Sequence, residues 1–238
     1  MKNKIDRRKK YMIVLDTETC PMDNSVNQVS ASNMLVYDIG WAIVDKKGHV
    51  YKTHSYIVSD IFFEKTLMNS AYYANKISSY WKDIKNGSRF IKSLYHIRKS
   101  LLEDMAEYNV TEVYAHNAYF DLTSLNQTLR WVTKSKYRYF FPYETIICDT
   151  LKMSKYVLKP QKTYQKFCVE NNYITQNNQL RLTAEIIYRY ISRDKGFIES
   201  HTALEDVMIE KEILAYCYRA HKKMVKELWS NHDHKRKS

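Results

Sequence analysis

The hydrophobic pattern near the start of the chain predicts part of a β-sheet. Tyr11–Leu15 is a continuous apolar run that ends at Asp16, a pattern typical of a fully buried strand. Leu35–Val44 and His49–Val58 are predicted to be two further strands, because a polar turn separates them. The polar segment Cys20–Asn33 predicts a long loop. These three strands would form the antiparallel start of the sheet.

Helical spacing dominates the middle of the chain. Apolar residues between Ile61 and Asn109 recur at three and four positions, which predicts amphipathic helix. Glu112–Ala115 and Thr145–Cys148 predict two more strands. Helices are predicted over Tyr119–Trp131, Thr150–Val157, Thr163–Glu170 and Thr183–Ile191.

The last helix has the clearest start signal. A Thr-x-x-Glu capping box at residues 202–205 predicts that the helix begins at Ala203, and it can run to about Trp229. This start places Asp206 in the first helical turn and His201 in the loop just before it.

Composition narrows the class of protein. The 238 residues suit one domain with insertions, and a hydrophobic content of 45% excludes a disordered chain. No run approaches the roughly 18 apolar residues of a membrane helix, so we expect a soluble cytoplasmic protein with no membrane role. The four cysteines form no C-x-x-C pair, which favours reduced thiols. We predict a basic flexible arm at residues 1–10, a main domain at 11–229 with insertions near 20–34 and 61–90, and a basic tail at 230–238.

The net charge and the absence of several motifs narrow the class of protein further. The four glycines are too widely spaced for a G-x-G-x-x-G or P-loop motif, and H-E-x-x-H and G-x-S-x-G are absent. The net charge of +12 points to a polyanionic partner, although a basic surface alone is weak evidence. A carboxylate cluster inside such a positive field would be more specific, because it can hold metal ions against phosphate.

Two carboxylates follow the first strand. Asp16 and Glu18 are two positions apart, so on a strand both side chains point to the same face. There they repel each other and lose hydration, and a divalent cation relieves both effects. Oxygen ligands suit Mg²⁺ or Mn²⁺. The motif alone leaves a solvent-exposed acidic strand end as the alternative.

Two more motifs place acidic residues at helix starts. Residues 115–121 read A-H-N-A-Y-F-D, and Asp121 lies near the start of the helix that follows. Residues 201–206 read H-T-A-L-E-D, with His201 ahead of the helix and Asp206 in its first turn. Taken alone, Asp121 could simply favour the helix dipole, and His201 could be structural.

In their order along the chain, these three motifs resemble those of the DEDDh 3′–5′ exonucleases, the DnaQ-like group of the RNase H-like superfamily. The resemblance implies an α/β fold of the RNase H-like type, with a mixed five-stranded sheet and helices on both faces. Val36–Gly40 resembles the second strand of that fold. The middle of the chain also resembles, less specifically, exonucleases encoded by phages and mobile elements.

The resemblance also implies roles. Asp16, Glu18, Asp121 and Asp206 would hold two divalent metal ions, Mg²⁺ or Mn²⁺. His201 would be the general base that takes a proton from the attacking water, and an ordinary histidine pKa near 6.5 suits that role. A sister group has tyrosine in a Y-x-x-x-D motif instead. The implied reaction is hydrolysis at the 3′ end of single-stranded DNA or RNA, which releases nucleoside 5′-monophosphates.

Four residues beside the carboxylates are candidates for substrate contact: Thr17, Thr19, Asn117 and Phe120, the last of which could equally belong to the core. Two other functions stay open. One is a catalytically silent nucleic-acid-binding module of the same fold, and the other is a nuclease for short or signalling oligonucleotides. Homodimers are common among such exonucleases, and the sequence leaves the oligomeric state open.

Overall fold

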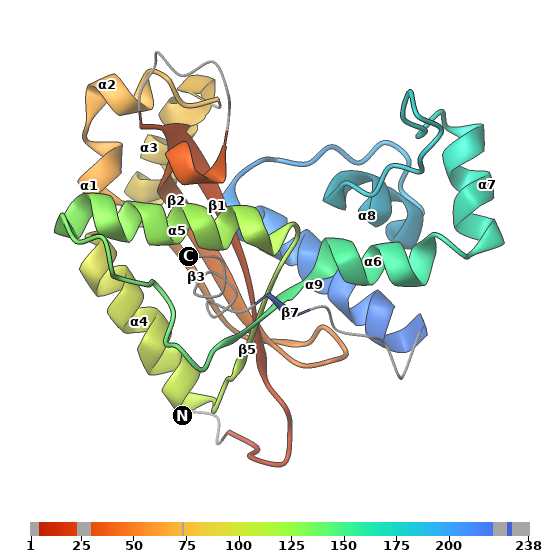
Figure 1. Cartoon of the computed structure of the whole chain (residues 1–238), viewed down its shortest axis with the longest axis horizontal. Coiled ribbons are helices and arrows are strands. Elements are labelled where there is room, and N and C mark those ends of the chain that lie inside the picture. The colour runs from red at the N-terminus through yellow and green to blue at the C-terminus, as the bar shows by residue number, and fades with distance from the viewer. Residues whose placement is uncertain (1–4, 23–29, 73, 221–227, 230–238) are drawn as a thin grey trace.

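The computed structural model describes residues 5–22, 30–72, 74–220 and 228–229. In this part of the chain, a mixed sheet runs through the molecule with helices on both sides (Figure 1), and its seven strands have the order β4-β3-β2-β1-β5-β6-β7. The central strand β1 pairs antiparallel with β2 and parallel with β5. The strands are β1 (Met12–Pro21), β2 (Met34–Val44), β3 (Val50–Val58), β4 (Phe90–Lys92), β5 (Glu112–Ala115), β6 (Ile146–Asp149) and β7 (Leu228–Trp229).

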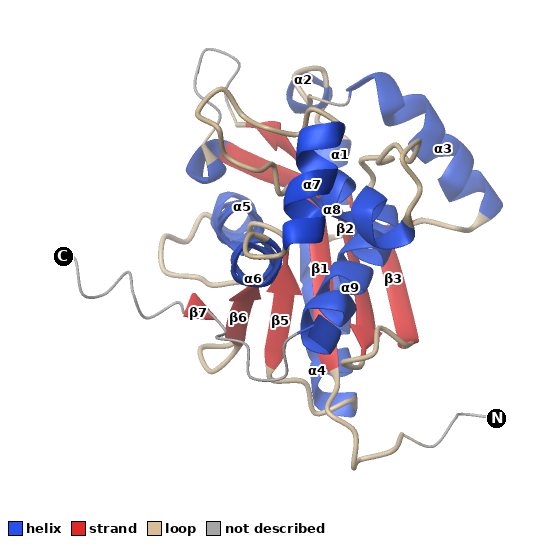
Figure 2. Cartoon of the chain, turned by 90° about the vertical axis from the view of Figure 1, so that its right-hand side faces the viewer, coloured by secondary structure: helices blue, strands red, loops and turns tan. Residues whose placement is uncertain are grey.

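The helices divide between the two faces of the sheet. The α-helices are α1 (Ser59–Phe62), α2 (Lys65–Met68), α3 (Ile77–Asn86), α4 (Leu94–Glu107), α5 (Ala118–Thr133), α6 (Thr150–Leu158), α7 (Lys162–Glu170), α8 (Ala184–Ser192) and α9 (Ala203–Ala220). Two short 3₁₀ helices, η1 (Ala31–Asn33) and η2 (Ala74–Lys76), precede β2 and α3. Helices α4 and α5 pack on one face, and α6 and α9 pack on the other (Figure 2).

Alternation along β1 explains why both faces are covered. Ile13 and Leu15 belong to the core under α4 and α5, whereas Met12 and Val14 belong to the core under α6 and α9. A strand with apolar side chains on both faces must be buried on both, because neither face can be left in water without loss of hydrophobic stabilisation. The same period of two fixes the direction of the polar residues that follow.

The predicted α/β fold class is confirmed. The five predicted strands are the five central ones, β3-β2-β1-β5-β6, and the short strands β4 and β7 extend the two edges. Strand β4 interrupts the segment for which helical spacing was predicted, where Phe90–Lys92 pairs with β3.

Two predicted boundaries are wrong. The loop expected from Cys20 begins later, because β1 pairs with β2 as far as Pro21 opposite Met34. The last helix ends at Ala220 in the described residues, and Leu228–Trp229 pairs with the edge of β6 instead of continuing a helix. The part predicted as helix between these segments lies outside the described residues.

The structure describes part of the predicted arm and none of the predicted tail. Residues 1–4 and the predicted tail at 230–238 lie outside the described residues. Within the arm, Lys10 forms an ion pair with Glu112 at 2.5 Å, and Lys9 donates a hydrogen bond to the Tyr51 hydroxyl at 2.8 Å. All four cysteines are buried and free. None of the described helices is both long enough and apolar enough to cross a membrane.

Candidate functional site

The first two carboxylates lie on the face of the sheet that α9 covers. Asp16 and Glu18 continue the alternation of Met12 and Val14 along β1, so their side chains leave the same face. They stand near the C-terminal end of β1, whose neighbour β5 runs parallel to it. In α/β sheets this is the edge where ligands bind, outside the carboxyl ends of the strands.

The start of α9 is held directly over these carboxylates. Gly40 on β2 pairs with Asp16, and a Cβ atom at Gly40 would lie 2.4 Å from the backbone nitrogen of Leu204. Any side chain there would force the helix away from the sheet. The helix begins at Ala203 as predicted. The sequence did not predict that the Ala203 N–H donates a hydrogen bond of 3.1 Å to the carboxylate of Asp38 on β2.

Asp38 is held in turn by a buried arginine. The Arg89 guanidinium donates to both carboxylate oxygens of Asp38 at 2.8 Å and to Glu205 at 3.2 Å. Its plane lies over the ring of Tyr80, with 4.8 Å between the guanidinium carbon and the ring centre. Arg89 and Tyr80 both come from the predicted insertion at 61–90, so this segment helps to position α9.

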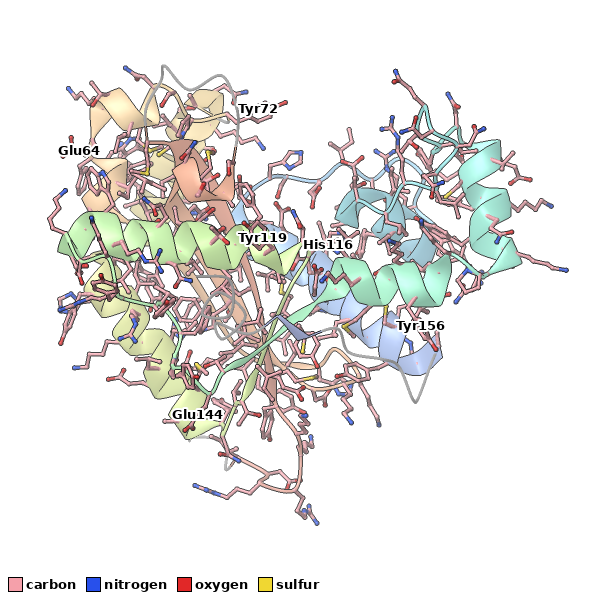
Figure 3. All side chains as sticks on the ribbon, in the orientation of Figure 1. Glu64, Tyr72, His116, Tyr119, Glu144 and Tyr156 are labelled. Carbon is pink, nitrogen blue, oxygen red and sulfur yellow. The ribbon has the colours of Figure 1, made fainter. Side chains whose placement is uncertain are left out.

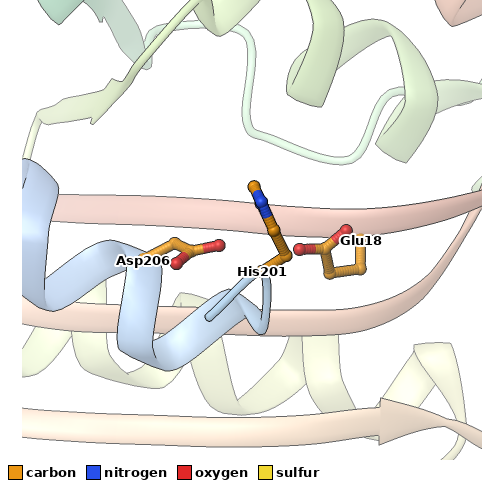
Figure 4. Close-up of side chains that lie close together, drawn as sticks. All are labelled: Glu18, His201 and Asp206. Atoms are coloured by element: carbon orange, nitrogen blue, oxygen red, sulfur yellow. The ribbon is translucent and has the colours of Figure 1, made fainter. Parts of the chain in front are cut away.

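Anchoring α9 in this way brings three site residues together (Figure 4). Ligand atoms of Glu18, His201 and Asp206 lie within 4.8 Å of one another. Asp206 is buried in the first turn of α9, and His201 is partly exposed in the loop before it. His201 has a left-handed backbone with φ of 52°, a conformation that is uncommon for residues with a side chain. This local bend separates the histidine from the axis of the helix.

Asp121 enters from the opposite side of β1. Helix α5 begins directly after β5, and Asp121 in its first turn accepts a hydrogen bond of 2.8 Å from the Thr17 hydroxyl. Thr17 points to the face opposite Asp16 and Glu18, because it lies between them on the strand. The Thr17 hydroxyl thus positions a carboxylate, and the Thr17 backbone also hydrogen-bonds to Asp121, so the substrate contact of Thr17 stays a prediction.

A pocket of about 660 Å³ opens over the site. It is lined by six of the predicted residues: Asp16, Thr17, Glu18, Asn117, His201 and Asp206. Three others, Thr19, Phe120 and Asp121, do not line it. Thr19 is buried and Phe120 is half-buried, so their substrate contacts stay predictions.

The far wall of the pocket was not predicted. It is formed by residues 180–184, just before and at the start of α8, and by His116 at the end of β5 (labelled in Figure 3). A ring nitrogen of His116 lies 2.8 Å from the Leu182 carbonyl oxygen, and the other lies 3.1 Å from the Thr150 hydroxyl. His116 therefore ties this wall to the sheet. Its burial lowers its pKa, which favours the neutral ring.

Burial dominates the electrostatics of the carboxylates. Desolvation, together with Asp38, raises the pKa of Glu18 to about 8, and desolvation with Glu199 raises that of Asp206 to about 9. The pKa of Asp121 rises to about 7, again mainly by desolvation. That of Asp16 lies well above its ordinary value because of burial and the charges of the other acidic residues. Such a group of carboxylates is stable only when protons or cations balance it.

The histidine shows the opposite shift. Desolvation lowers the pKa of His201, and the Lys76 ammonium lowers it further. Lys76 ends the short helix η2 and donates a hydrogen bond to the carbonyl oxygen of Ser200, beside the histidine. The same ammonium lowers the pKa values of Glu18 and Asp206. The segment 61–90 thus adds a positive charge to the site.

The donor atoms fit a hard divalent cation. One carboxylate oxygen of Asp206, Oδ1, is buried without a hydrogen-bond partner in the described part of the chain. A buried carboxylate oxygen without a partner is costly, and cation binding removes that cost. The neighbouring ligand atoms are mainly carboxylate oxygens, which suit Mg²⁺ or Mn²⁺ better than softer metals.

Sequence reasoning missed three residues in or behind the site. Glu210 lies on α9 four residues after Asp206, a spacing that already places both on one helix face. Lys76 and Arg89 gave no local signal, because they reach the site only through the packing of the insertion against β2 and the loop before α9.

Comparison with known structures defines the class of fold. The sheet and its helices form an α/β fold of the RNase H-like type, which is shared by a 3′-exonuclease, by Exonuclease I and by Pop2p. Neither a protein-family model nor a curated protein sequence matches the chain.

Individual structures match most of the chain at low sequence identity. A full-length 3′-exonuclease matches 96% of the chain and 69% of its own length, with a TM-score of 0.59 at 10% identity. Exonuclease I of E. coli in complex with a 5cy-dT13 oligonucleotide matches 89%, with a TM-score of 0.53 at 9% identity, but the chain spans only 40% of that protein. S. pombe Pop2p in its Mg²⁺- and Mn²⁺-bound form matches 90% of the chain and 85% of its own length, with a TM-score of 0.50 at 14% identity.

Proposed function

We propose that the protein is a metal-dependent 3′–5′ exonuclease. It would hydrolyse the terminal phosphodiester bond of single-stranded nucleic acid and release nucleoside 5′-monophosphates. One observation carries this proposal. Ligand atoms of Glu18, His201 and Asp206 lie within 4.8 Å of one another, in the pocket that Asp16 also lines, at the C-terminal end of the central strand. The fold shared with 3′-exonuclease structures supports it.

In this proposal Asp16, Glu18, Asp121 and Asp206 hold two divalent cations, Mg²⁺ or Mn²⁺. When bound, such a pair stabilises charge on the attacking and leaving oxygens of an in-line displacement. The protein positions its ligands on rigid elements: two on β1, one in the first turn of α5 and one in the first turn of α9. The Thr17 hydroxyl fixes Asp121, and Asp38 fixes the start of the helix that carries Asp206.

His201 acts as the general base. Its lowered pKa keeps the ring neutral at pH 7, so it can accept a proton from the attacking water. Glu199 lies 3.9 Å from the His201 Nδ1 atom, and the charge of Glu185 favours the imidazolium that forms. The histidine lies on a loop, so it can adjust to the substrate while the carboxylates stay fixed.

The pocket supplies a place for the terminal nucleotide. Asn117 is exposed beside the carboxylates and can donate to a base or sugar, and Arg181 on the far wall can pair with a phosphate. The net charge of +12 favours the binding of a longer polyanion, because binding releases counterions from the polyanion. Exonuclease I, which shares the fold, is described in complex with a single-stranded oligonucleotide.

A strand-degradation assay tests the proposal. Single-stranded DNA and RNA, labelled at the 5′ end, are incubated with the full chain in Mg²⁺, in Mn²⁺ and in EDTA, with circular single-stranded DNA as a substrate without ends. We expect a metal-dependent ladder that shortens from the 3′ end, with the circle intact. Asp206→Asn should give no ladder.

Three other results would each overturn part of the proposal. Cleavage of the circle would indicate an endonuclease. Binding without cleavage would indicate a silent binding module. Cleavage confined to the shortest strands would indicate an enzyme for short or signalling oligonucleotides.

A further inference from the structure

A fifth carboxylate lies in the wall of the pocket, outside every sequence motif. Glu210 follows Asp206 by four residues on α9, so both side chains lie on the same face of the helix. Only 3% of Glu210 is exposed, and it lines the same pocket as Asp16, Glu18 and Asp206. Glutamate is almost never buried to this extent unless it is paired.

The two oxygens of Glu210 have different environments. Oε1 accepts a hydrogen bond of 3.2 Å from the backbone N–H of His116, at the end of β5. Oε2 is buried and has no hydrogen-bond partner in the described part of the chain. A role in holding β5 against α9 accounts for Oε1 alone. An unpartnered carboxylate oxygen in a buried site needs a second explanation.

The surroundings of Glu210 are acidic. Besides burial, the charges of Asp121 and Asp206 raise its pKa well above the ordinary value, and Glu210 in turn raises the pKa of Asp16. A glutamate kept only for structure would be better placed as glutamine, which accepts the same hydrogen bond without adding a charge. The chain instead adds negative charge at a position where it interacts with Asp16, Asp121 and Asp206.

We propose that Glu210 is a fifth carboxylate of the metal centre and contributes its Oε2 atom to a divalent cation held with Asp16. This proposal rests on the proposed function, since it assigns a further ligand to the same centre. On this proposal, five carboxylates and not only the four predicted ones bind the metal ions.

Direct measurement of Mn²⁺ binding tests the assignment. Mn²⁺ is titrated into the full chain, and free Mn²⁺ is followed by electron paramagnetic resonance, which requires no catalysis. Glu210→Gln keeps an oxygen that can accept the His116 N–H, so a structural role would survive the change. We expect Mn²⁺ affinity to fall by at least roughly 10- to 100-fold for one ion, since that is the loss found when partners of metal ligands are altered and a direct ligand should matter at least as much.

Two further variants separate ligation from charge. Glu212→Gln makes the same change two residues along α9, where the side chain pairs with Lys211 outside the pocket, and its Mn²⁺ affinity should equal that of the wild type. Glu210→Asp keeps the charge but shortens the side chain by one methylene. A ligand role predicts weaker Mn²⁺ binding in this variant too. It also provides the test if Glu210→Gln fails to fold.

The outcomes are distinct. Wild-type affinity in either Glu210→Gln or Glu210→Asp would overturn the assignment while leaving the exonuclease proposal in place. A wild-type protein that binds no Mn²⁺ would overturn both. Weaker binding in both Glu210 variants, with Glu212→Gln unchanged, is the expected result.

Discussion

Two buried groups of charged side chains lie on the same face of the sheet, and their charges are balanced differently. On β2, Asp38 is fully buried, and the guanidinium of Arg89 pairs with both of its oxygens at 2.8 Å. On the neighbouring strand, Glu18 stands opposite Asp38 in the register but belongs to a group of carboxylates that repel one another. Lys76 offsets only part of that repulsion.

The difference separates a structural role from a chemical one. Burial raises the pKa of Asp38, but the charge of Arg89 lowers it again and fixes the carboxylate, which suits Asp38 as the acceptor for the first N–H of α9. Carboxylates that raise one another's pKa values store repulsion that a divalent cation can relieve. The paired group should therefore contribute to stability, whereas the acidic group should reduce stability and provide activity.

The largest effect expected is on the acidic group. Asp16→Asn removes a metal ligand, so hydrolysis should be abolished. In EDTA the thermal midpoint should rise, because folding no longer has to bury or protonate this carboxylate. The checks are the strand-degradation assay and a melting curve. Glu103→Gln, at an exposed position on α4, should change neither. A lower midpoint for Asp16→Asn in EDTA would contradict the idea of stored repulsion.

The histidine should separate catalysis from metal binding. His201→Ala should reduce turnover by roughly 10²–10⁴, the contribution of a general base, while Mn²⁺ affinity stays near that of the wild type. Asp206→Asn should lose both properties. The measurements are single-turnover hydrolysis and Mn²⁺ titration on the same samples. If His201→Ala weakens Mn²⁺ binding as much as Asp206→Asn does, the histidine is a ligand rather than a base.

The paired group should show the reverse pattern. Arg89→Met leaves Asp38 buried without its partner, and loss of one member of a buried pair costs about 3–5 kcal/mol. Urea unfolding measures this loss, and the double variant Asp38→Asn/Arg89→Met should recover part of it, because asparagine still accepts the Ala203 N–H. Lys99→Met, which breaks an exposed pair with Glu103, should cost about 0.3–0.5 kcal/mol. If Arg89→Met and Lys99→Met lost the same free energy of unfolding, Arg89 would have no special role in stability.

The sequence predicted the parts of the site that depend on local structure. Alternation along a strand places Asp16 and Glu18 on one face, and a helix start places Asp206 beside His201. The charge balance was not predictable, because Arg89 and Lys76 come from the segment 61–90, whose packing depends on contacts distant in sequence. The start of α9 illustrates the limit: its position was correct, but Asp38, 165 residues earlier in the chain, accepts its first N–H.

The pH dependence of stability should expose the acidic group. The folded-state pKa values of Asp121, Glu18 and Asp206 are raised from 3.8 or 4.5 to about 7, 8 and 9. The folded protein then binds more protons than the unfolded chain between these limits, so stability should fall as pH rises from about 4 to about 9 in EDTA. Melting curves across this range measure the slope, which should be shallower in Asp206→Asn and in the wild type with Mg²⁺. An equal slope in Asp206→Asn would contradict the assignment.

The smallest effect concerns the positive charge that Lys76 brings to the site. Lys76 lowers the pKa of His201, so Lys76→Met should raise that pKa. A base with a higher pKa is protonated at higher pH, so the acid limb of the rate profile should move to higher pH. Lys76→Arg keeps the charge and should leave the limb in place. A shift of equal size in both variants would mean that Lys76 acts through packing and not through its charge. The charge of Lys76 could then not be credited with offsetting part of the repulsion among the carboxylates.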